Sequence, residues 1–259
     1  MKKKILALLL GLGMCMGLCG CSSANKNELV IGITENVPMN YHDDSGELIG
    51  FETEFTKAVC EKLGMTPKFQ PIEWTKKEIE LKSKNIDLIW NGLTVTEDRK
   101  KDMLFTKSYM KNKQATVVKA ENADKYKDIA NMAGITVAFE SGSAGEDVVS
   151  TVSELSTVNK IPCSAQKDAL LEVKSGTSDA CIIDFTMAKA ATAEGTDFSD
   201  LVVLENITNT DEEYAIGGRL EDTELIEKIN KAIDELAAEG KLREIAKKYN
   251  LDDALLIGG

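Results

Sequence analysis

The sequence contains a single histidine, His42, and this scarcity excludes several kinds of catalytic or metal site. A metal site with several histidine ligands is impossible, and a serine–histidine–aspartate site would have to use His42 itself. His42 stands in the polar run 41–46, which ends in Ser45 and Gly46 and is typical of a turn. We therefore expect a solvated loop histidine rather than a catalytic one.

Basic residues are in deficit, because 43 Asp and Glu face 31 Lys and Arg and give a net charge of −12. Residues 1–20 hold three lysines and no acidic residue, so removing them leaves −15. Nucleic-acid binding requires a basic face, which this charge balance does not provide. We therefore expect no nucleic-acid partner.

CxxC spacing is absent, which makes a cysteine metal cluster improbable. After the N-terminal region only Cys60, Cys163 and Cys181 remain. Cys60 falls on an apolar helix face and Cys181 in an apolar strand, so both are expected to be small buried residues. A bridge between Cys163 and Cys181 is conceivable and is left open.

No hydrophobic run is long enough for an ordinary membrane-spanning helix. The apolar run 5–18 follows three lysines and has about the length of a signal-peptide core. Leu18-Cys19-Gly20-Cys21 then resembles a lipobox, which implies cleavage before Cys21 and diacylation of its thiol. We expect a lipoprotein signal peptide at 1–20 and a tether at 21–27. The alternative is ordinary secretion with an incidental cysteine.

Apolar periodicity in the remaining chain alternates between strand and helix patterns, which predicts an α/β fold with mainly parallel sheets. Phe51, Phe55, Val59 and Leu63 repeat at helical spacing, and Gly64 is placed to end that helix. Strands are expected at 28–33, 67–74, 86–90, 114–118, 135–139, 158–162, 180–183, 201–204 and 211–215. Further helices are expected at 76–84, 166–174, 185–193, 225–236 and 242–249.

One stretch combines the features of an anion site. The apolar run 86–90 reads as a buried strand, Gly92 breaks it, and Thr94 adds a hydroxyl. Thr96 sits at a predicted helix N-cap and Arg99 in the first turn after it. A strand end, exposed backbone, a hydroxyl and an arginine together suit a carboxylate.

Residues 86–100, with Thr96 to Lys100 reading Thr-Glu-Asp-Arg-Lys, resemble the signature of the family 3 solute-binding proteins, the polar amino-acid receptors of ABC importers. The segment 105–110, Phe-Thr-Lys-Ser-Tyr-Met, is similar to another family segment. The resemblance implies a two-lobed periplasmic-binding-protein-like fold (type II), with two crossover strands and a ligand cleft between the lobes. Lobe I would span 28–115 and 213–259, and lobe II 116–212.

The resemblance also implies which residues grip an amino acid. Arg99 would hold the α-carboxylate with the hydroxyl and N–H of Thr94, while the Gly92 carbonyl would accept from the ammonium. Ser143, in the small-residue loop 141–145, would close on the carboxylate from the other lobe. Asp184, at the end of an apolar strand, would hold the ammonium; the alternative is that it only caps the next helix.

The pocket for the ligand side chain is less defined by the sequence. Its candidates are Asn36, Trp74, Asn91 and Phe139, with Trp74 either in the pocket or in the core. No candidate apart from Arg99 is basic, which disfavours an acidic ligand. A polar, neutral amino acid fits the asparagines best.

The expected protein is thus a monomeric receptor, lipid-anchored at the extracytoplasmic face of the cell membrane, that delivers an amino acid to an ABC permease with its ATP-binding subunit. It would have no cofactor and no enzyme activity. One alternative is a dehydratase of prephenate-like acids on the same fold, with Glu35 as the only obvious general acid. The other is a ligand-sensing module, disfavoured because the chain ends near Gly259 without a transmembrane or signalling segment.

Overall fold

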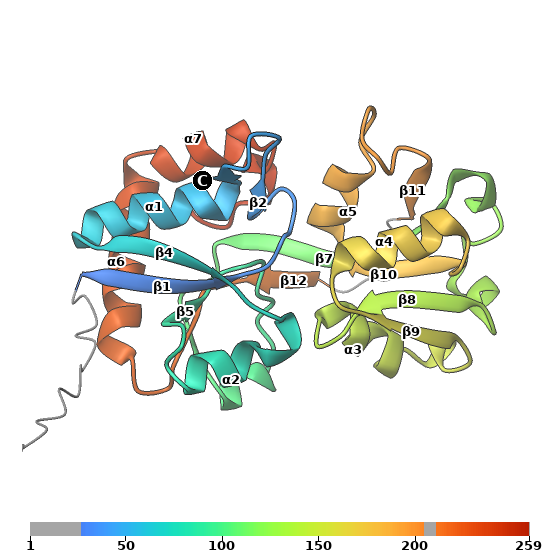
Figure 1. Ribbon diagram of the computed structural model, residues 1–259, viewed down its shortest axis with the longest axis horizontal. Helices are drawn as coiled ribbons and strands as arrows, with labels where there is room; N and C mark the ends of the chain where they lie inside the picture. Colours follow the sequence, from blue (N-terminus) through green and yellow to red (C-terminus); the bar gives the residue numbers. More distant parts are fainter. Residues whose placement is uncertain (1–26, 205–210, 259) are drawn as a thin grey trace, which may run out of the picture.

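The computed structural model describes residues 27–204 and 211–258, and this part of the chain forms two bodies joined by two strands (Figure 1). Each body has its own β-sheet, covered by helices, and its own hydrophobic clusters. The expected two-lobed α/β fold is therefore confirmed. Within residues 27–204 and 211–258, no helix has the length and apolar character needed to cross a membrane.

Lobe I, on the left of Figure 1, is built on a five-stranded sheet. β1 runs parallel to β4 and β5, whereas β13 runs antiparallel to β5 and β6. In order across the sheet the strands are β4 (Thr66–Pro71), β1 (Glu28–Ile33), β5 (Leu88–Ile89), β13 (Gly217–Gly218) and β6 (Leu104–Phe105). The helices are α1 (Phe51–Leu63), α2 (Lys77–Lys82), α6 (Thr223–Ala238) and α7 (Lys241–Lys248), and β2 (Tyr41–His42) pairs with β3 (Leu48–Ile49).

Lobe II, on the right of Figure 1, is built on the second large sheet. β8 runs parallel to β9 and β10, whereas β7 runs antiparallel to β10 and β11. The strands are β11 (Leu201–Leu204), β7 (Met110–Lys119), β10 (Ala180–Asp184), β8 (Thr136–Glu140) and β9 (Asn159–Cys163), and the helices are α3 (Ala144–Thr151), α4 (Gln166–Ser175) and α5 (Phe185–Ala191). Short 3-10 turns lie at Trp74–Lys76, Arg99–Lys101, Ala120–Asn122, Ile129–Met132, Ser153–Leu155 and Asp252–Ala254.

The two lobes are joined by β7 and β12 (Asp211–Tyr214), which pair antiparallel side by side (Figure 1). Met110 and Tyr214 lie in the core of lobe I, whereas Ala115 and Val117 on the same strand β7 lie in the core of lobe II. The expected lobe boundaries, after residues 115 and 212, fall within these strands and stay a prediction. Because the strands that return between lobes run against their neighbours, both sheets are mixed rather than mainly parallel.

The core of lobe I explains why α1 forms where the spacing predicted it. Phe51, Phe55 and Val59 are fully buried on one face, and Phe55 meets Trp90 edge-on at 5.0 Å between ring centroids. Burying each such side chain contributes about 1.5–3 kcal/mol relative to leaving it exposed. Gly64 ends the helix with a left-handed φ of 65°, as expected.

Several expected elements are shorter than the sequence patterns indicated. The strand expected at 86–90 pairs only over Leu88–Ile89, and the helix expected to carry Arg99 is one 3-10 turn. Asp98 stands directly before this turn and makes no side-chain capping bond, while the Arg99 N–H donates to the hydroxyl of Thr96, the predicted N-cap, at 3.1 Å. The apolar pattern of the sequence therefore predicted the positions of these segments but not the length of their hydrogen-bonded parts.

The three described cysteines are free thiols. Cys60 and Cys181 are buried, as expected, and burial raises the pKa of Cys60 to about 11. Cys163 and Cys181 lie on β9 and β10, and β8 separates these two strands, so the bridge left open by the sequence does not form. The signal segment 1–20 and Cys21 lie outside the described residues.

Candidate ligand-binding site

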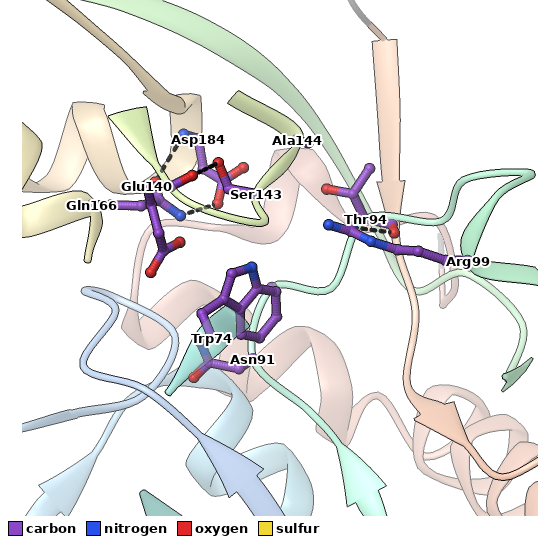
Figure 2. Close-up of a pocket in the computed structure, with 10 residues that line it drawn as sticks. Trp74, Asn91, Thr94, Arg99, Glu140, Ser143, Ala144, Gln166 and Asp184 are labelled. Carbon is purple, nitrogen blue, oxygen red and sulfur yellow. Dashed lines mark hydrogen bonds between the residues drawn. The ribbon is translucent and has the colours of Figure 1, made fainter. Parts of the chain in front are cut away.

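A pocket lies where the two lobes meet, and it brings together seven of the nine predicted ligand-binding residues (Figure 2). The free volume among its lining residues is about 10 Å³. This volume accommodates about one water molecule, so the lobes would have to part before a ligand could enter. The lining is Trp74, Asn91, Gly92, Thr94 and Arg99 from lobe I, with Glu140, Ser143, Ala144, Gln166 and Asp184 from lobe II.

The Arg99 guanidinium reaches from lobe I to lobe II. Its Nη1 donates to the Thr94 carbonyl at 2.7 Å, and its Nη2 donates to the Gly142 carbonyl at 3.1 Å. The same planar fork that holds two carbonyl oxygens matches the two oxygens of a carboxylate. A ligand carboxylate at this place would compete with the Gly142 carbonyl for Nη2.

The backbone of the Gly92 turn is hydrogen-bonded to the buried carboxyl group of Glu52. The Gly92 N–H donates to Glu52 Oε1 at 2.8 Å and Oε2 at 3.0 Å, and the Tyr109 hydroxyl donates to the same carboxyl. Burial raises the pKa of Glu52 to about 7. Gly92 has φ +57°, and a Cβ there would approach Asn36 Nδ2 to 3.2 Å. A glycine is therefore required both by the backbone and by the space.

Asp184 ends β10 and is buried at the floor of the pocket. Its carboxylate accepts from the side-chain amides of Asn112 (3.0 Å), Gln114 (2.7 Å) and Gln166. It makes no capping hydrogen bond to α5, so the helix-cap alternative is not what the side chain does. Burial raises the pKa of Asp184, and the amide donors oppose that rise.

A second acid, Glu212, shares the donors of Asp184. Asn112 Nδ2 and Gln114 Nε2 donate to Glu212 Oε2 at 3.2 Å and 3.0 Å, and the Thr94 hydroxyl donates to it at 3.2 Å. The Thr94 hydroxyl therefore faces an acid of the crossing strand β12. Burial and the nearby Asp184 raise the pKa of Glu212 to about 7.

The loop before α3 is shaped by helix capping. The Ser143 hydroxyl accepts from the Glu146 N–H at 3.2 Å and donates to the Glu140 carbonyl at 2.7 Å. Glu146 in turn accepts from the Gly142 N–H at 2.6 Å, so cap and helix hold one another. Ser143 lines the pocket, but its hydroxyl is occupied by the helix it starts.

Trp74 and Asn91 reach the pocket while remaining part of lobe I. Trp74 is 5% exposed and belongs to a hydrophobic cluster with Leu81 and Ile86, so it is both pocket wall and core. Asn91 Oδ1 accepts from the Thr34 N–H, and its Nδ2 donates to the Thr34 hydroxyl. The Asn91 amide thus fixes the first loop to the strand end.

Two predicted pocket residues do not line this pocket. Phe139 packs in the core of lobe II, because successive side chains of β8 point to opposite faces of the sheet. Asn36 is buried beside Gly92, and its backbone closes a turn with Met39 and Asn40. Phe139 and Asn36 are therefore absent from the lining of this pocket, and their predicted contact with a ligand stays a prediction.

Sequence reasoning missed Glu140 and Gln166, which line the pocket from lobe II. Glu140 is the residue after the strand expected at 135–139, and Gln166 is the first residue of the predicted helix 166–174. Gln166 binds both the backbone and the carboxylate of Asp184, since its Oε1 accepts from the Asp184 N–H at 2.9 Å and its Nε2 donates to the carboxylate. The rule that ligands bind at the carboxyl ends of parallel strands points to both positions.

The pocket region carries more buried acid than base. Glu52, Glu140, Asp184 and Glu212 are buried or nearly so, whereas the nearby bases are the buried Lys77 and the partly buried Arg99. Burial first, then the nearby Asp184, raises the pKa of Glu140 to about 8. A cation placed among these groups would favour their charged forms.

The sequence as a whole matches a known family. The family model of the bacterial extracellular solute-binding proteins, family 3, matches residues 29–252. The chain belongs to this family.

Its relatives in this family bind amino acids. The arginine-binding extracellular protein ArtP of Bacillus subtilis (strain 168) is 26% identical over 253 residues, which cover 95% of this chain and 98% of ArtP. An ABC uptake transporter substrate binding protein from Streptococcus pneumoniae, solved with bound histidine, is 33% identical with a TM-score of 0.82 and covers 89% of this chain and 95% of its own. An ancestral arginine-binding protein bound to arginine is 31% identical with a TM-score of 0.80, covering 86% and 98%.

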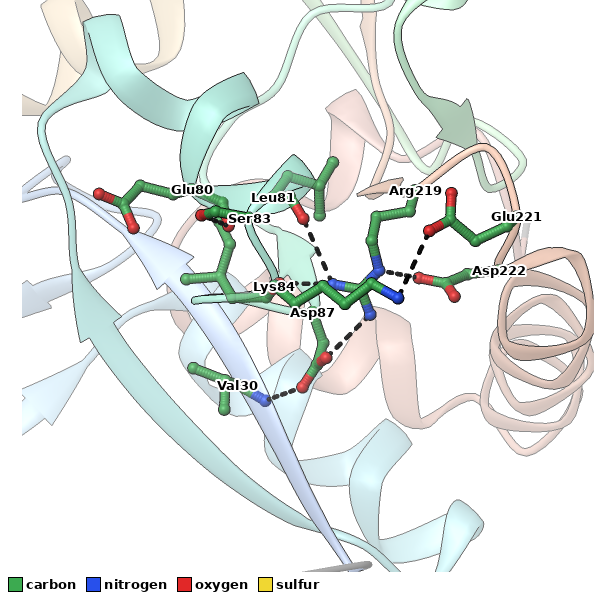
Figure 3. Close-up of polar contacts among 10 residues, drawn as sticks. Val30, Glu80, Leu81, Ser83, Lys84, Asp87, Arg219, Glu221 and Asp222 are labelled. Carbon is green, nitrogen blue, oxygen red and sulfur yellow. Dashed lines mark hydrogen bonds and ion pairs between the residues drawn. The ribbon is translucent and has the colours of Figure 1, made fainter. Parts of the chain in front are cut away.

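This family 3 protein has a second arginine of interest, the buried Arg219, whose role is structural (Figure 3). Its Nη1 donates to the Ile86 carbonyl at 2.7 Å, its Nη2 pairs with Asp87 at 2.9 Å, and its Nε lies 2.7 Å from Asp222. Asp87 also accepts from the Val30 N–H at 3.0 Å. The guanidinium therefore ties β13 to β1, to the start of β5 and to the start of α6.

Replacing Arg219 with Met should lower the free energy of unfolding by about 3 kcal/mol. This is the lower part of the range for breaking a buried ion pair, because Asp87 keeps some contact with water. Urea unfolding measures the change. Lys84→Met is the matched control, since Lys84 pairs with Glu221 at 3.8 Å between largely exposed side chains and should change stability by less than about 1 kcal/mol. Equal losses in both variants would contradict this role of Arg219.

The raised carboxyl pKa values predict that stability falls as pH rises. In the folded protein Glu140 keeps its proton to a pKa of about 8, whereas its ordinary value is 4.5. The folded state therefore binds more protons between these values, and the stabilisation present below 4.5 is lost as the pH passes about 8. Glu140→Gln should flatten the dependence of the urea midpoint on pH over this range, whereas the exposed Glu121→Gln should leave it unchanged. An unaltered profile for Glu140→Gln would contradict the assignment.

Proposed function

We propose that this protein is a receptor that binds an α-amino acid between its two lobes and delivers it to an ABC permease. The observation that carries the proposal is that Arg99 from lobe I and Asp184 from lobe II line one pocket. A cation and an anion from separate lobes match the two charged ends of an amino acid. Arg99 would fork the α-carboxylate, and Asp184, held by three amides, would accept from the α-ammonium.

Binding would require the lobes to part and close again. The lobes are joined by β7 and β12, so hinge motion about these strands is the expected movement. On closing, the ligand carboxylate would take the place of the Gly142 carbonyl at Arg99 Nη2. A ligand lacking either charged end would leave Arg99 or Asp184 buried without a full set of partners, which is the basis of selectivity.

A cationic ligand side chain matches this pocket best. The sequence favoured a polar, neutral amino acid, because the pocket candidates included two asparagines and no base besides Arg99. The pocket also contains Glu140, and Glu212 lies next to Asp184. Relatives whose names give arginine or histidine as ligand support the same choice.

We further propose the lipid-anchored location expected from residues 1–21. Diacylation of Cys21 would tether a monomeric receptor to the extracytoplasmic face of the cell membrane, because two acyl chains give a stable anchor. The partner would be the permease with its ATP-binding subunit. The dehydratase alternative is disfavoured, because Glu35 is exposed and pairs with His42 instead of lining the pocket.

Isothermal titration calorimetry against the twenty amino acids, ornithine and cystine should detect binding of a cationic amino acid. Asp184→Asn and Arg99→Lys should each weaken it by about 2–5 kcal/mol, since each removes one charge or one fork from a buried ligand pair. Lys100→Met, an exposed neighbour of Arg99, is the control and should bind normally. No heat with any compound would overturn the receptor proposal.

Replacing Cys21 with Ser should release the protein from the membrane fraction into the culture medium or periplasm. The physical reason is that the serine hydroxyl cannot take the thioether-linked diacyl group that anchors the chain. Fractionation followed by immunoblotting measures the distribution, with Cys19→Ser as the control that should stay in the membrane fraction. Equal membrane retention of both variants would argue against the anchor at Cys21.

A further inference from the structure

Lys77 is a lysine in an environment where lysines are rarely found. It is the first residue of α2 and is 3% exposed, and it does not line the ligand pocket. Fully buried lysines are almost always paired with an acid. The ion pair of Lys77 is with its own neighbour Glu78 at 3.2 Å, and the Glu78 side chain is 30% exposed. This pair alone does not account for the burial of the ammonium.

The contacts of the Lys77 ammonium cross from lobe I to lobe II. Its Nζ donates to the Gly142 carbonyl at 3.0 Å and to the Trp74 carbonyl at 3.3 Å. It also lies 4.8 Å from the centre of the Trp74 ring. Lys77 therefore links a wall of the pocket in lobe I to the loop of lobe II that opens α3.

Two cations share the same acceptor. Arg99 Nη2 donates to the Gly142 carbonyl at 3.1 Å, beside the Lys77 Nζ at 3.0 Å. Burial first, and then Arg99, lowers the pKa of Lys77. Burying a second cation next to the first is unfavourable, so the contacts made to lobe II have to offset that cost. When the lobes part, Lys77 loses Gly142 and regains water.

The two cations differ in what a ligand would do to them. Arg99 lines the pocket, so a bound carboxylate would draw it away from the Gly142 carbonyl. Lys77 lies outside the lining and can keep its bond to Gly142 in the closed arrangement whether or not a ligand is bound. A contact that does not depend on the ligand shifts the equilibrium between the open and closed arrangements by the same amount whether or not a ligand is bound.

We propose that Lys77 is a positioning residue that holds the two lobes together through the Gly142 carbonyl, independently of any ligand, and keeps Trp74 in place as a pocket wall. Hydrogen bonds to charged groups contribute enough that losing this one should shift the ratio of open to closed molecules about tenfold or more. The proposal goes beyond amino-acid binding, because it concerns lobe closure without an amino acid.

Small-angle X-ray scattering without added amino acid tests the proposal. The chain from residue 21, carrying Cys21→Ser, keeps every described element and both cores, so it retains the whole fold. Lys77→Met should increase the radius of gyration, and Lys77→Arg, which keeps a donor, should restore it. Lys76→Met is the matched control, because Lys76 is exposed, pairs with Glu73 and should leave the radius unchanged. A wild-type radius for Lys77→Met would overturn the proposal.

Acrylamide quenching of tryptophan fluorescence gives a second readout that a general loss of stability would not mimic. Trp90 is fully buried in lobe I, so a change in quenching of the folded protein reports on Trp74. Lys77→Met should increase quenching about twofold or more, and Lys77→Gln, which keeps a neutral donor, should give a smaller increase. If Lys77→Met does not fold, Lys77→Gln carries the test in both measurements, and an unchanged radius and quenching for it would overturn the proposal. Neither readout depends on which ligand binds. A calorimetric screen that detects no ligand would therefore not affect the test of Lys77.

Discussion

Arg99 and Asp184 come from different lobes and face the same pocket, and the connection that allows this is the strand pair β7 and β12. The same two strands also supply the groups that orient Asp184. Asn112 and Gln114 on β7 donate to it, and Glu212 on β12 shares those donors. The connection between the lobes and one end of the pocket are therefore a single hydrogen-bonded unit, so the proposed hinge motion would alter the surroundings of Asp184.

Several polar groups at the pocket already have partners within the protein, whereas the buried Trp74 Nε1 has none. Arg99 donates to two backbone carbonyls, Gly92 donates to Glu52, and the Ser143 hydroxyl caps α3. Buried polar groups are costly when unpaired, so these internal bonds stabilise the closed arrangement. A ligand has to replace some of them with bonds at least as favourable. In the proposed receptor this requirement would favour molecules with a carboxylate and an ammonium correctly spaced, and the interlobe contacts would contribute to the free energy of binding.

Charge balance supports the proposed preference for a cationic ligand. Buried acids outnumber the nearby bases, and burial raises the pKa of Glu140 to about 8 and that of Glu212 to about 7. A neighbouring cation would stabilise the charged form of these carboxyl groups, which burial disfavours. Membership of a family whose relatives bind arginine and histidine agrees with this preference. On the outer surface, by contrast, acids such as Glu97, Asp98 and Glu224 are paired with lysines.

The sequence by itself determined the order of strands and helices and the strand-end positions of Arg99, Thr94 and Asp184. These follow from local periodicity and from motifs that lie close together in the chain. The two-lobed fold was expected from the resemblance to the family 3 solute-binding proteins. Only the tertiary structure decided which neighbour of a strand end faces the cleft, as with Phe139 in the core and Glu140 in the pocket. It also placed Gln166, Glu212 and Lys77 beside the site. A one-residue change of face on a strand, and contacts between residues 65 or more positions apart such as Lys77 and Gly142, depend on packing that local patterns do not encode.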